Sequence, residues 1–260
     1  MVTGLDRFRD YFADYRDRYV LIGGTAMWLV LDEAGLRPRA TRDLDIVLCI
    51  EALDSEFATY LWEFIRAGGY QIQQKSVGEK TFYRFGQPSE EDYPLMLELF
   101  SRQPEKMALG DDSHLTPIPV AEDVSSLSAI LLDDVWYEFI HRNAREIDGV
   151  SIVDQRCLIP LKARAWLDLV DRKANGEKID SKDIKKHRND VIRLFQLLAP
   201  EERIALPEAM ATDLELFLQR VEQEIDGNLL ANLDIKGTQP DEVIAMIGKV
   251  FEIPVNGDEG

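Results

Sequence analysis

The order of apolar and polar residues predicts strands in the first part of the chain and helices throughout. Apolar residues at helical spacing predict helices over residues 5–18, 25–34 and 55–67. Short apolar or alternating runs predict strands over residues 19–22, 43–50, 70–75, 81–85, 95–100 and 150–152. We therefore expect the chain to begin with an α+β region.

The pattern changes after about residue 155. Helical periodicity without a strand pattern continues over residues 159–170, 181–198, 207–225 and 240–251. This change predicts two domains, an α+β domain over residues 1–155 and a helical domain over residues 156–260.

Length and composition narrow the class of protein. The 260-residue chain has no run of about 18 apolar residues, so no membrane span and no membrane partner are expected. Its charged N-terminal segment is not typical of a secretory signal. Cys49 and Cys157 lie in apolar surroundings, which favours buried thiols over a disulfide. We expect a cytoplasmic protein.

The net charge of −18 disfavours a general attraction to nucleic acid. A divalent cation would offset clustered carboxylates, although solvated surface accounts for such an excess in most proteins. The short basic run KKHR, residues 185–188, is either a contact for an RNA backbone or an ordinary helix surface.

Two aspartates begin the strand predicted over residues 43–50. Asp43 and Asp45 are two residues apart, so both point to one face of the strand, while Leu44 and Ile46 point to the core. Two neighbouring carboxylates repel each other unless a cation lies between them, and Mg²⁺ takes such oxygen ligands together with substrate phosphates.

A second metal ion would require a third carboxylate. Glu98 interrupts the apolar run 95–100, where an unpaired carboxylate would be costly. A metal shared with Asp43 and Asp45 would remove that cost. Alternatively, Glu98 lies on a solvated face or pairs with Arg84 or Arg102.

A glycine turn precedes the helix predicted over residues 25–34. Gly23 and Gly24 would let a phosphate approach the backbone, and the N–H groups of the helix would favour an anion. Thr25 would cap the helix or donate its hydroxyl to phosphate. Glycine turns of this kind are common, and the chain has neither GxxxxGK[ST] nor GxGxxG at this position.

The combination of these motifs is more specific. The GGTA sequence from Gly23, followed by R-x-T-x-D-L-D-I from Arg39 to Ile46, resembles the nucleotidyltransferase superfamily that shares the DNA polymerase β fold. Within it, the AbiEii/AbiGii-type toxins of bacterial type IV toxin–antitoxin and abortive-infection systems are the most similar. The resemblance implies a mixed β-sheet flanked by helices, then a helical domain that completes the active-site cleft.

The second half carries a further part of the family's pattern. Lys162 and Arg164 lie on one predicted helix, and Asp183 begins the next, followed by Lys186, His187 and Asp190. In the family, the lysine would bind triphosphate, and Asp183 would orient it or assist the incoming hydroxyl. The alternative is a structural salt bridge between Lys162 and Asp183.

Together these features predict an enzyme that uses Mg²⁺, with two ions, to transfer a nucleotide from an NTP to an acceptor. The proposed catalytic residues are Asp43, Asp45, Glu98, Lys162 and Asp183. The first three would bind metal. The expected nucleotide-binding residues are Gly23, Gly24, Thr25, Thr41 and Lys162.

The resemblance implies a tRNA 3′ end as acceptor, a toxin function and a cognate antitoxin. The acidity of the chain favours a small molecule or a protein as acceptor instead. A protein of another class, an inert NTP-binding or antitoxin-binding module, would keep the fold without turnover. Two departures from the family pattern are Thr25, where serine often follows the glycine, and Glu98, where aspartate is common.

Overall fold

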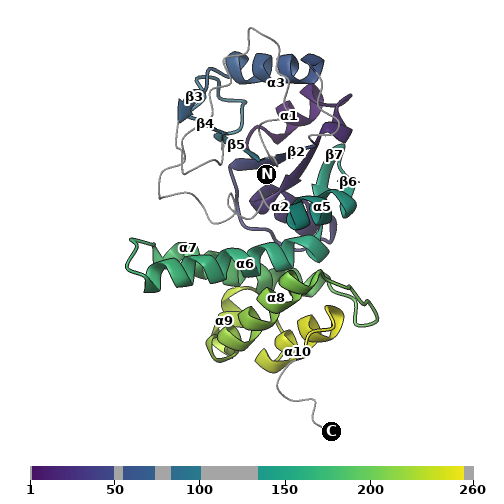
Figure 1. Ribbon diagram of the computed structural model, residues 1–260, viewed down its shortest axis with the longest axis vertical. Helices are drawn as coiled ribbons and strands as arrows, with labels where there is room; N and C mark the ends of the chain where they lie inside the picture. Colours follow the sequence, from purple (N-terminus) through teal and green to yellow (C-terminus); the bar gives the residue numbers. More distant parts are fainter. Residues whose placement is uncertain (1, 50–54, 74–82, 101–133, 255–260) are drawn as a thin grey trace. The chain divides into compact units, whose positions relative to one another are not determined.

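The computed structural model describes residues 2–49, 55–73, 83–100 and 134–254, and the statements below refer to these residues. The chain divides into two compact units, Met1–Asp154 and Gln155–Gly260, shown in Figure 1. The first contains the β-sheet and the second is helical.

The first unit is built on a mixed sheet with the order β3-β4-β5-β2-β1-β7-β6. Its strands are β1 (Tyr19–Ile22), β2 (Asp43–Leu48), β3 (Gln71–Gln73), β4 (Tyr83–Gly86), β5 (Met96–Phe100), β6 (Ala144–Ile147) and β7 (Val150–Val153). The pairs β1–β7 and β2–β5 are parallel, and the other pairs are antiparallel. The expected fold class, a mixed sheet with helices followed by a helical region, is confirmed.

The described helices of this unit are α1 (Leu5–Tyr11), α2 (Gly23–Glu33), α3 (Ser55–Ala67) and α5 (Asp134–Arg142). Helices α1 and α3 lie side by side (Figure 1) and pack through aromatic rings. Phe8 contacts Phe64 edge to face, and Tyr11 stacks on Tyr60 with 4.2 Å between ring centroids. Phe8 and Phe64 are fully buried, and burying such a ring stabilises the fold by about 1.5–3 kcal/mol.

The structure differs from the predicted elements at several points. The helix predicted over residues 5–18 ends at Tyr11, and a short 3₁₀ helix, η1 (Arg16–Arg18), follows it. Helix α2 begins at Gly23 itself rather than after the glycine pair. Parts of the strands predicted over residues 70–75 and 81–85 lie outside the described residues.

The hairpin β6–β7 was predicted only in its second strand. Asp148 and Gly149 form its turn with φ of 49° and 75°, and Ile147 pairs with Val150 across it. A two-residue turn with positive φ at both positions matches the right-handed twist of the strands, and Asp-Gly is a favoured sequence for it. The signal for this hairpin is therefore present in the sequence.

The second unit contains α6 (Gln155–Ala174), α7 (Ser181–Leu194), α8 (Glu208–Val221), α9 (Gly227–Asn232) and α10 (Pro240–Val250), with 3₁₀ turns η4 (Phe195–Leu197) and η5 (Glu222–Glu224). Its core contains buried aliphatic and aromatic side chains, among them Leu161, Trp166, Val191, Leu214, Phe217 and Ile247. None of the helices in the described ranges has the length and apolar character needed to cross a membrane.

Candidate active site

The glycine turn lies directly against the aspartate strand. Strands β1 and β2 are antiparallel with Ile22 opposite Asp45, so Gly23 follows at the level of this carboxylate. A Cβ atom on Gly23 would lie 1.8 Å from Asp45 Oδ2, and one on Gly24 would lie 2.6 Å from Thr41 Oγ1. Only glycine leaves space for these two side chains at the start of α2.

This geometry predicts a large effect for Gly23→Ala. The added methyl group would displace the Asp45 carboxylate, and a misplacement of about 1 Å at a reacting centre lowers a rate by about 10²-fold. We expect a loss of that size in any activity that depends on the Asp45 carboxylate.

Gly35→Ala is the matched control for this substitution. Gly35 has φ of 69°, close to the 66° of Gly23, but among the described residues no atom other than those of its immediate neighbours in the chain lies within 4 Å of its Cβ position. Both substitutions therefore introduce similar backbone strain, about 1–2 kcal/mol, and only Gly23→Ala disturbs Asp45. Equal activity of the two variants would contradict the prediction.

The start of α2 is suited to an anion. The cap position is Ile22, which makes no side-chain cap hydrogen bond to the first turn of this 11-residue helix. The uncapped N–H groups and the helix dipole favour negative charge there. Arg39 adds positive charge, because its Nη2 lies 3.6 Å from the position of a Cβ on Gly24. Arg39 belongs to the sequence motif, but it was not among the predicted site residues.

The hydroxyl of Thr25 makes a contact that the sequence did not predict. Its side chain is fully buried, and its hydroxyl donates a hydrogen bond of 2.8 Å to the backbone oxygen of Asp43. Thr25 lies inside α2, so it is not the helix cap. Since a hydroxyl has one proton to donate, this bond ties the helix to β2 rather than leaving a donor for phosphate.

Three acidic side chains share one face of the central strands. Glu98 on β5 lies opposite Asp45 in the parallel pairing of β2 and β5. Residues directly opposite in a ladder point to the same face of the sheet, and Asp43 shares that face with Asp45. The structure thus brings together all three predicted metal-binding carboxylates in neighbouring strand positions.

Glu98 also has a basic partner. Arg84 lies opposite Glu98 in the antiparallel pairing of β4 and β5, and the two side chains form an ion pair. The pairing with Arg84 that the sequence left open is therefore present, together with the proximity to Asp45. Arg102, the other suggested partner, lies outside the described residues.

Burial of Glu98, which is 5% exposed, and to a smaller extent the charge of Asp45 raise the pKa of its carboxyl group to about 7. The Arg84 guanidinium opposes this shift by favouring the charged form. The carboxylate form of Glu98 is thus costly near neutral pH, and additional positive charge at this face would stabilise it.

The donors at this face fit a hard divalent cation. Asp43 and Asp45 offer carboxylate oxygens, the ligand type that Mg²⁺ prefers. Across the described ranges, no group of three His, Cys, Asp or Glu residues is arranged to hold a metal ion. Asp43 and Asp45 are therefore the candidate metal ligands at this face.

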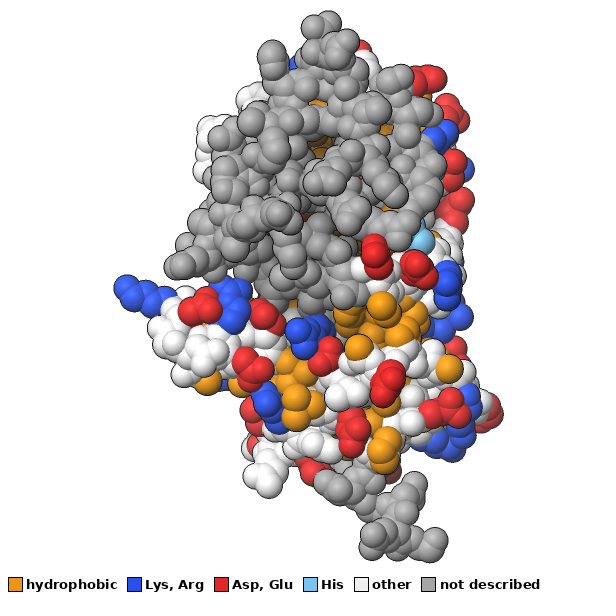
Figure 2. Space-filling model, viewed as in Figure 1, with side chains coloured by type: hydrophobic (Ala, Val, Ile, Leu, Met, Phe, Trp, Pro, Cys, Tyr) orange, Lys and Arg blue, Asp and Glu red, His pale blue; other side chains and the backbone are white. Residues whose placement is uncertain are grey.

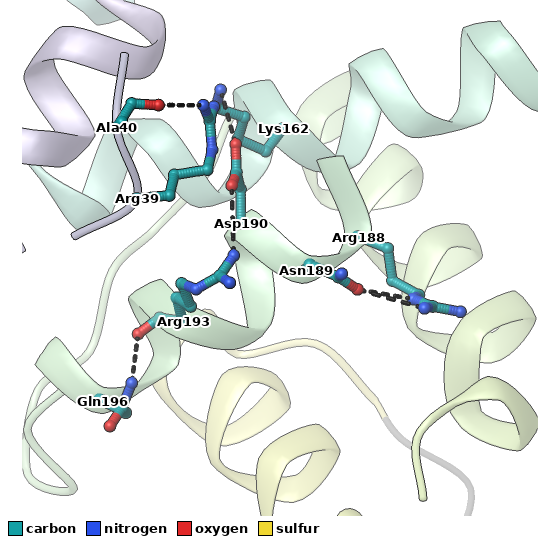
Figure 3. Close-up of polar contacts among 8 residues, drawn as sticks. All are labelled: Arg39, Ala40, Lys162, Arg188, Asn189, Asp190, Arg193 and Gln196. Atoms are coloured by element: carbon teal, nitrogen blue, oxygen red, sulfur yellow. Dashed lines mark hydrogen bonds and ion pairs between the residues drawn. The ribbon is translucent and has the colours of Figure 1, made fainter. Parts of the chain in front are cut away.

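In the helical unit, Lys162 pairs with a different residue from Asp183, the partner suggested from the sequence. Its Nζ lies 3.1 Å from Asp190 Oδ2 in a buried ion pair between α6 and α7, shown in Figure 3. Arg193 Nη1 lies 3.8 Å from the other oxygen of Asp190. The suggested salt bridge with Asp183 is wrong, because Asp183 is exposed in the first turn of α7, about two turns before Asp190. A triphosphate contact by Lys162 stays a prediction.

The basic run of residues 185–188 is only partly available at the surface. Lys185 and Lys186 are exposed, whereas Arg188 is buried and forms an ion pair with Glu224. Figure 2 shows acidic and basic side chains intermingled over the visible part of the helical unit. This segment therefore has the mixed character of an ordinary helix surface.

The chain was compared with known proteins. No family model matches it, and no curated protein matches it. It is similar to the crystal structure of an antigenic nucleotidyltransferase-like protein from Paracoccidioides brasiliensis, with 15% identity over 90% of this chain and 95% of that chain and a TM-score of 0.46. It is also similar to the Megavirus polyadenylate synthase, with 12% identity over 85% of this chain and 36% of that chain and a TM-score of 0.40. Likeness at this level carries no argument about activity.

Proposed function

We propose that this protein is a nucleotidyltransferase that transfers a nucleotide from an NTP to an acceptor. The divalent cation that it uses is Mg²⁺. The observation that carries the proposal is the position of Gly23 against the Asp45 carboxylate, with 1.8 Å between Oδ2 and the Cβ position. It brings an anion-binding turn and a cation-binding strand together. A nucleoside triphosphate with its metal ion requires both.

Each group at this site would bind one part of the substrate complex. Asp43 and Asp45 would hold the cation, which would neutralise charge on the triphosphate. The backbone N–H groups at Gly23 and Gly24 would bind phosphate oxygens. Arg39 and Thr41, both beside Gly24, would add a charge and a hydroxyl. The Glu98 carboxylate would accept a hydrogen bond from the acceptor hydroxyl.

Such a site would act by positioning and charge neutralisation. Phosphoryl-type transfer needs the attacking hydroxyl and the departing pyrophosphate held in line, with the developing charge stabilised. The fixed backbone at Gly23 and the paired strands β2 and β5 hold these groups on rigid elements. Lys162 and Asp183 of the helical unit are further candidates, by resemblance to the family alone.

We further propose which acceptor the enzyme uses and what the biological outcome is. The sequence resemblance to AbiEii/AbiGii-type toxins supports a tRNA 3′ end as acceptor, growth arrest as the outcome and a cognate antitoxin as partner. A small molecule or a protein as acceptor, and an inert NTP-binding module, are the alternatives that the assay below separates.

The test is transfer of label from each of the four α-³²P-labelled NTPs to total tRNA, to protein and to small-molecule hydroxyl acceptors. We expect labelling that requires Mg²⁺ and falls to background, about 10³-fold or more, when EDTA removes the metal. Excess Mg²⁺ should restore it. Labelling that persists in EDTA would refute the proposed cation dependence.

Calorimetric titration with each NTP, with and without Mg²⁺, completes the test. Mg²⁺-dependent binding together with transfer to one acceptor class supports the enzyme and identifies that class. Mg²⁺-dependent binding without transfer to any acceptor would favour the inert module. No NTP binding under either condition would refute both.

A further inference from the structure

Arg84 places a fixed positive charge beside the carboxylates of the proposed site. In the sheet, Asp45, Glu98 and Arg84 lie opposite one another on three adjacent strands, β2, β5 and β4. The Arg84 side chain is 21% exposed and the Glu98 side chain 7%. The pair therefore lies mostly out of solvent, where an ion pair is screened less than at the surface.

The ion pair engages Oε1 of Glu98, an oxygen that a metal ion at this carboxylate would also use. A guanidinium donates several N–H groups in a fixed fork, and its hydrogen bonds to a carboxylate use the same oxygen lone pairs that a cation would use. A divalent ion at Glu98 would have to displace Arg84 or lie next to its positive charge. Asp43 and Asp45 lie one strand away on the same face of the sheet.

We propose that Arg84 takes the place of a second divalent cation at Glu98, so that the site holds one ion on Asp43 and Asp45. The inference rests on the proposed function and replaces the two-ion arrangement expected from the sequence. Arg84 is then a positioning residue: its ion pair with Glu98 directs that carboxylate toward the acceptor rather than toward metal.

A structural salt bridge alone would make a different prediction. If the pair served only to stabilise the sheet, removing Arg84 would change stability without changing the number of ions bound. If Arg84 replaces a cation, its removal leaves Glu98 beside Asp45 with an unmet charge, and a second ion becomes favourable there. The number of bound ions therefore separates the two roles.

The experiment is a titration of the full-length protein with Mn²⁺ alone, in which electron paramagnetic resonance measures the free ion. The variants are Arg84→Gln, Arg84→Lys, Glu98→Gln and the double variant Arg84→Gln/Glu98→Gln. A chain of net charge −18 also binds Mn²⁺ at its surface. Each count is therefore taken relative to a blank in which Asp43→Asn, Asp45→Asn and Glu98→Gln are combined.

We expect about one Mn²⁺ per chain for the wild type and for Arg84→Lys, which keeps a cation at Glu98. We expect about two for Arg84→Gln, and about one again for the double variant, which lacks the carboxylate that binds the second ion. Circular dichroism and thermal melting verify that each variant is folded. Because the wild type and Arg84→Lys keep the ion pair, their counts test the proposal even if Arg84→Gln does not fold.

Two results would overturn the inference and leave the proposed function standing. One is a wild type that binds two ions, one of which is lost in Glu98→Gln. The other is a folded Arg84→Gln variant that binds one ion like the wild type. A wild type that binds no more Mn²⁺ than the blank would overturn the proposed cation site itself, and the inference with it.

Discussion

Replacing Asp45 by asparagine is expected to abolish nucleotide transfer while leaving the protein folded and at least as stable. Asparagine keeps the shape of the side chain but removes the charge that would hold a cation next to Gly23. Loss of a group that acts in the transition state costs about 10³-fold or more in rate. The transfer assay with labelled NTPs measures this loss.

The stability of Asp45→Asn is expected to move in the opposite direction. The Asp45 carboxylate raises the pKa of Glu98, which means that the two charges repel each other in the folded protein. Removing one charge relieves this repulsion, so the thermal midpoint in metal-free buffer should stay level or rise. Inactivity caused by unfolding would lower it.

Asp10→Asn is the matched control, because Asp10 is exposed in α1 of the same unit. It makes the same chemical change without touching the glycine turn, and both transfer and stability should stay at wild-type values. Transfer by Asp45→Asn at the level of Asp10→Asn would disprove the assignment of the site.

The second large effect concerns the ion pair of Lys162 and Asp190 in the helical unit. Asp190→Ala would leave the buried Lys162 ammonium without this carboxylate, and breaking a buried pair from one side typically costs about 3–5 kcal/mol. Urea denaturation followed by circular dichroism measures the free energy of unfolding. The exposed Asp183 on the same helix gives the control, Asp183→Ala, for which a change within about 0.5 kcal/mol is expected.

A double variant separates stability from function at this pair. Lys162→Met with Asp190→Leu removes both charges and fills the space with apolar side chains, which often restores the stability lost on breaking a buried pair. If Lys162 also binds triphosphate, this variant will be stable but will bind NTP more weakly. If NTP affinity is unchanged, the lysine has only its structural role. Asp190→Ala as stable as Asp183→Ala would contradict the importance of the pair.

Much of the site could be predicted because it depends on local sequence patterns. The alternation of residues 43–46 fixes which side chains share a face, and β2 shows Leu44 and Ile46 buried with Asp43 and Asp45 more exposed. The interrupted apolar run around Glu98 correctly indicated a carboxylate inside the sheet. The period of two determines which residues of β2 share a face, without reference to any other part of the chain.

The features that could not be predicted depend on contacts between distant segments. Nothing in the local pattern fixes β5 as the parallel neighbour of β2, and that pairing places Glu98 opposite Asp45. The choice of Asp190 over Asp183 depends on how α7 packs against α6. Helix α5 and strand β6 were not predicted, although the Asp148-Gly149 turn indicates the hairpin that contains β6.

The position of β2 inside the sheet has a consequence for how the protein folds. It pairs with β1 on one side and β5 on the other, so neither edge of the strand is open. A slip of one residue along either neighbour would turn Asp43 and Asp45 into the hydrophobic interior and expose Leu44 and Ile46 to water. Burying these carboxylates would strongly destabilise a misaligned sheet. The groups proposed for chemistry therefore also favour the native register while the fold forms.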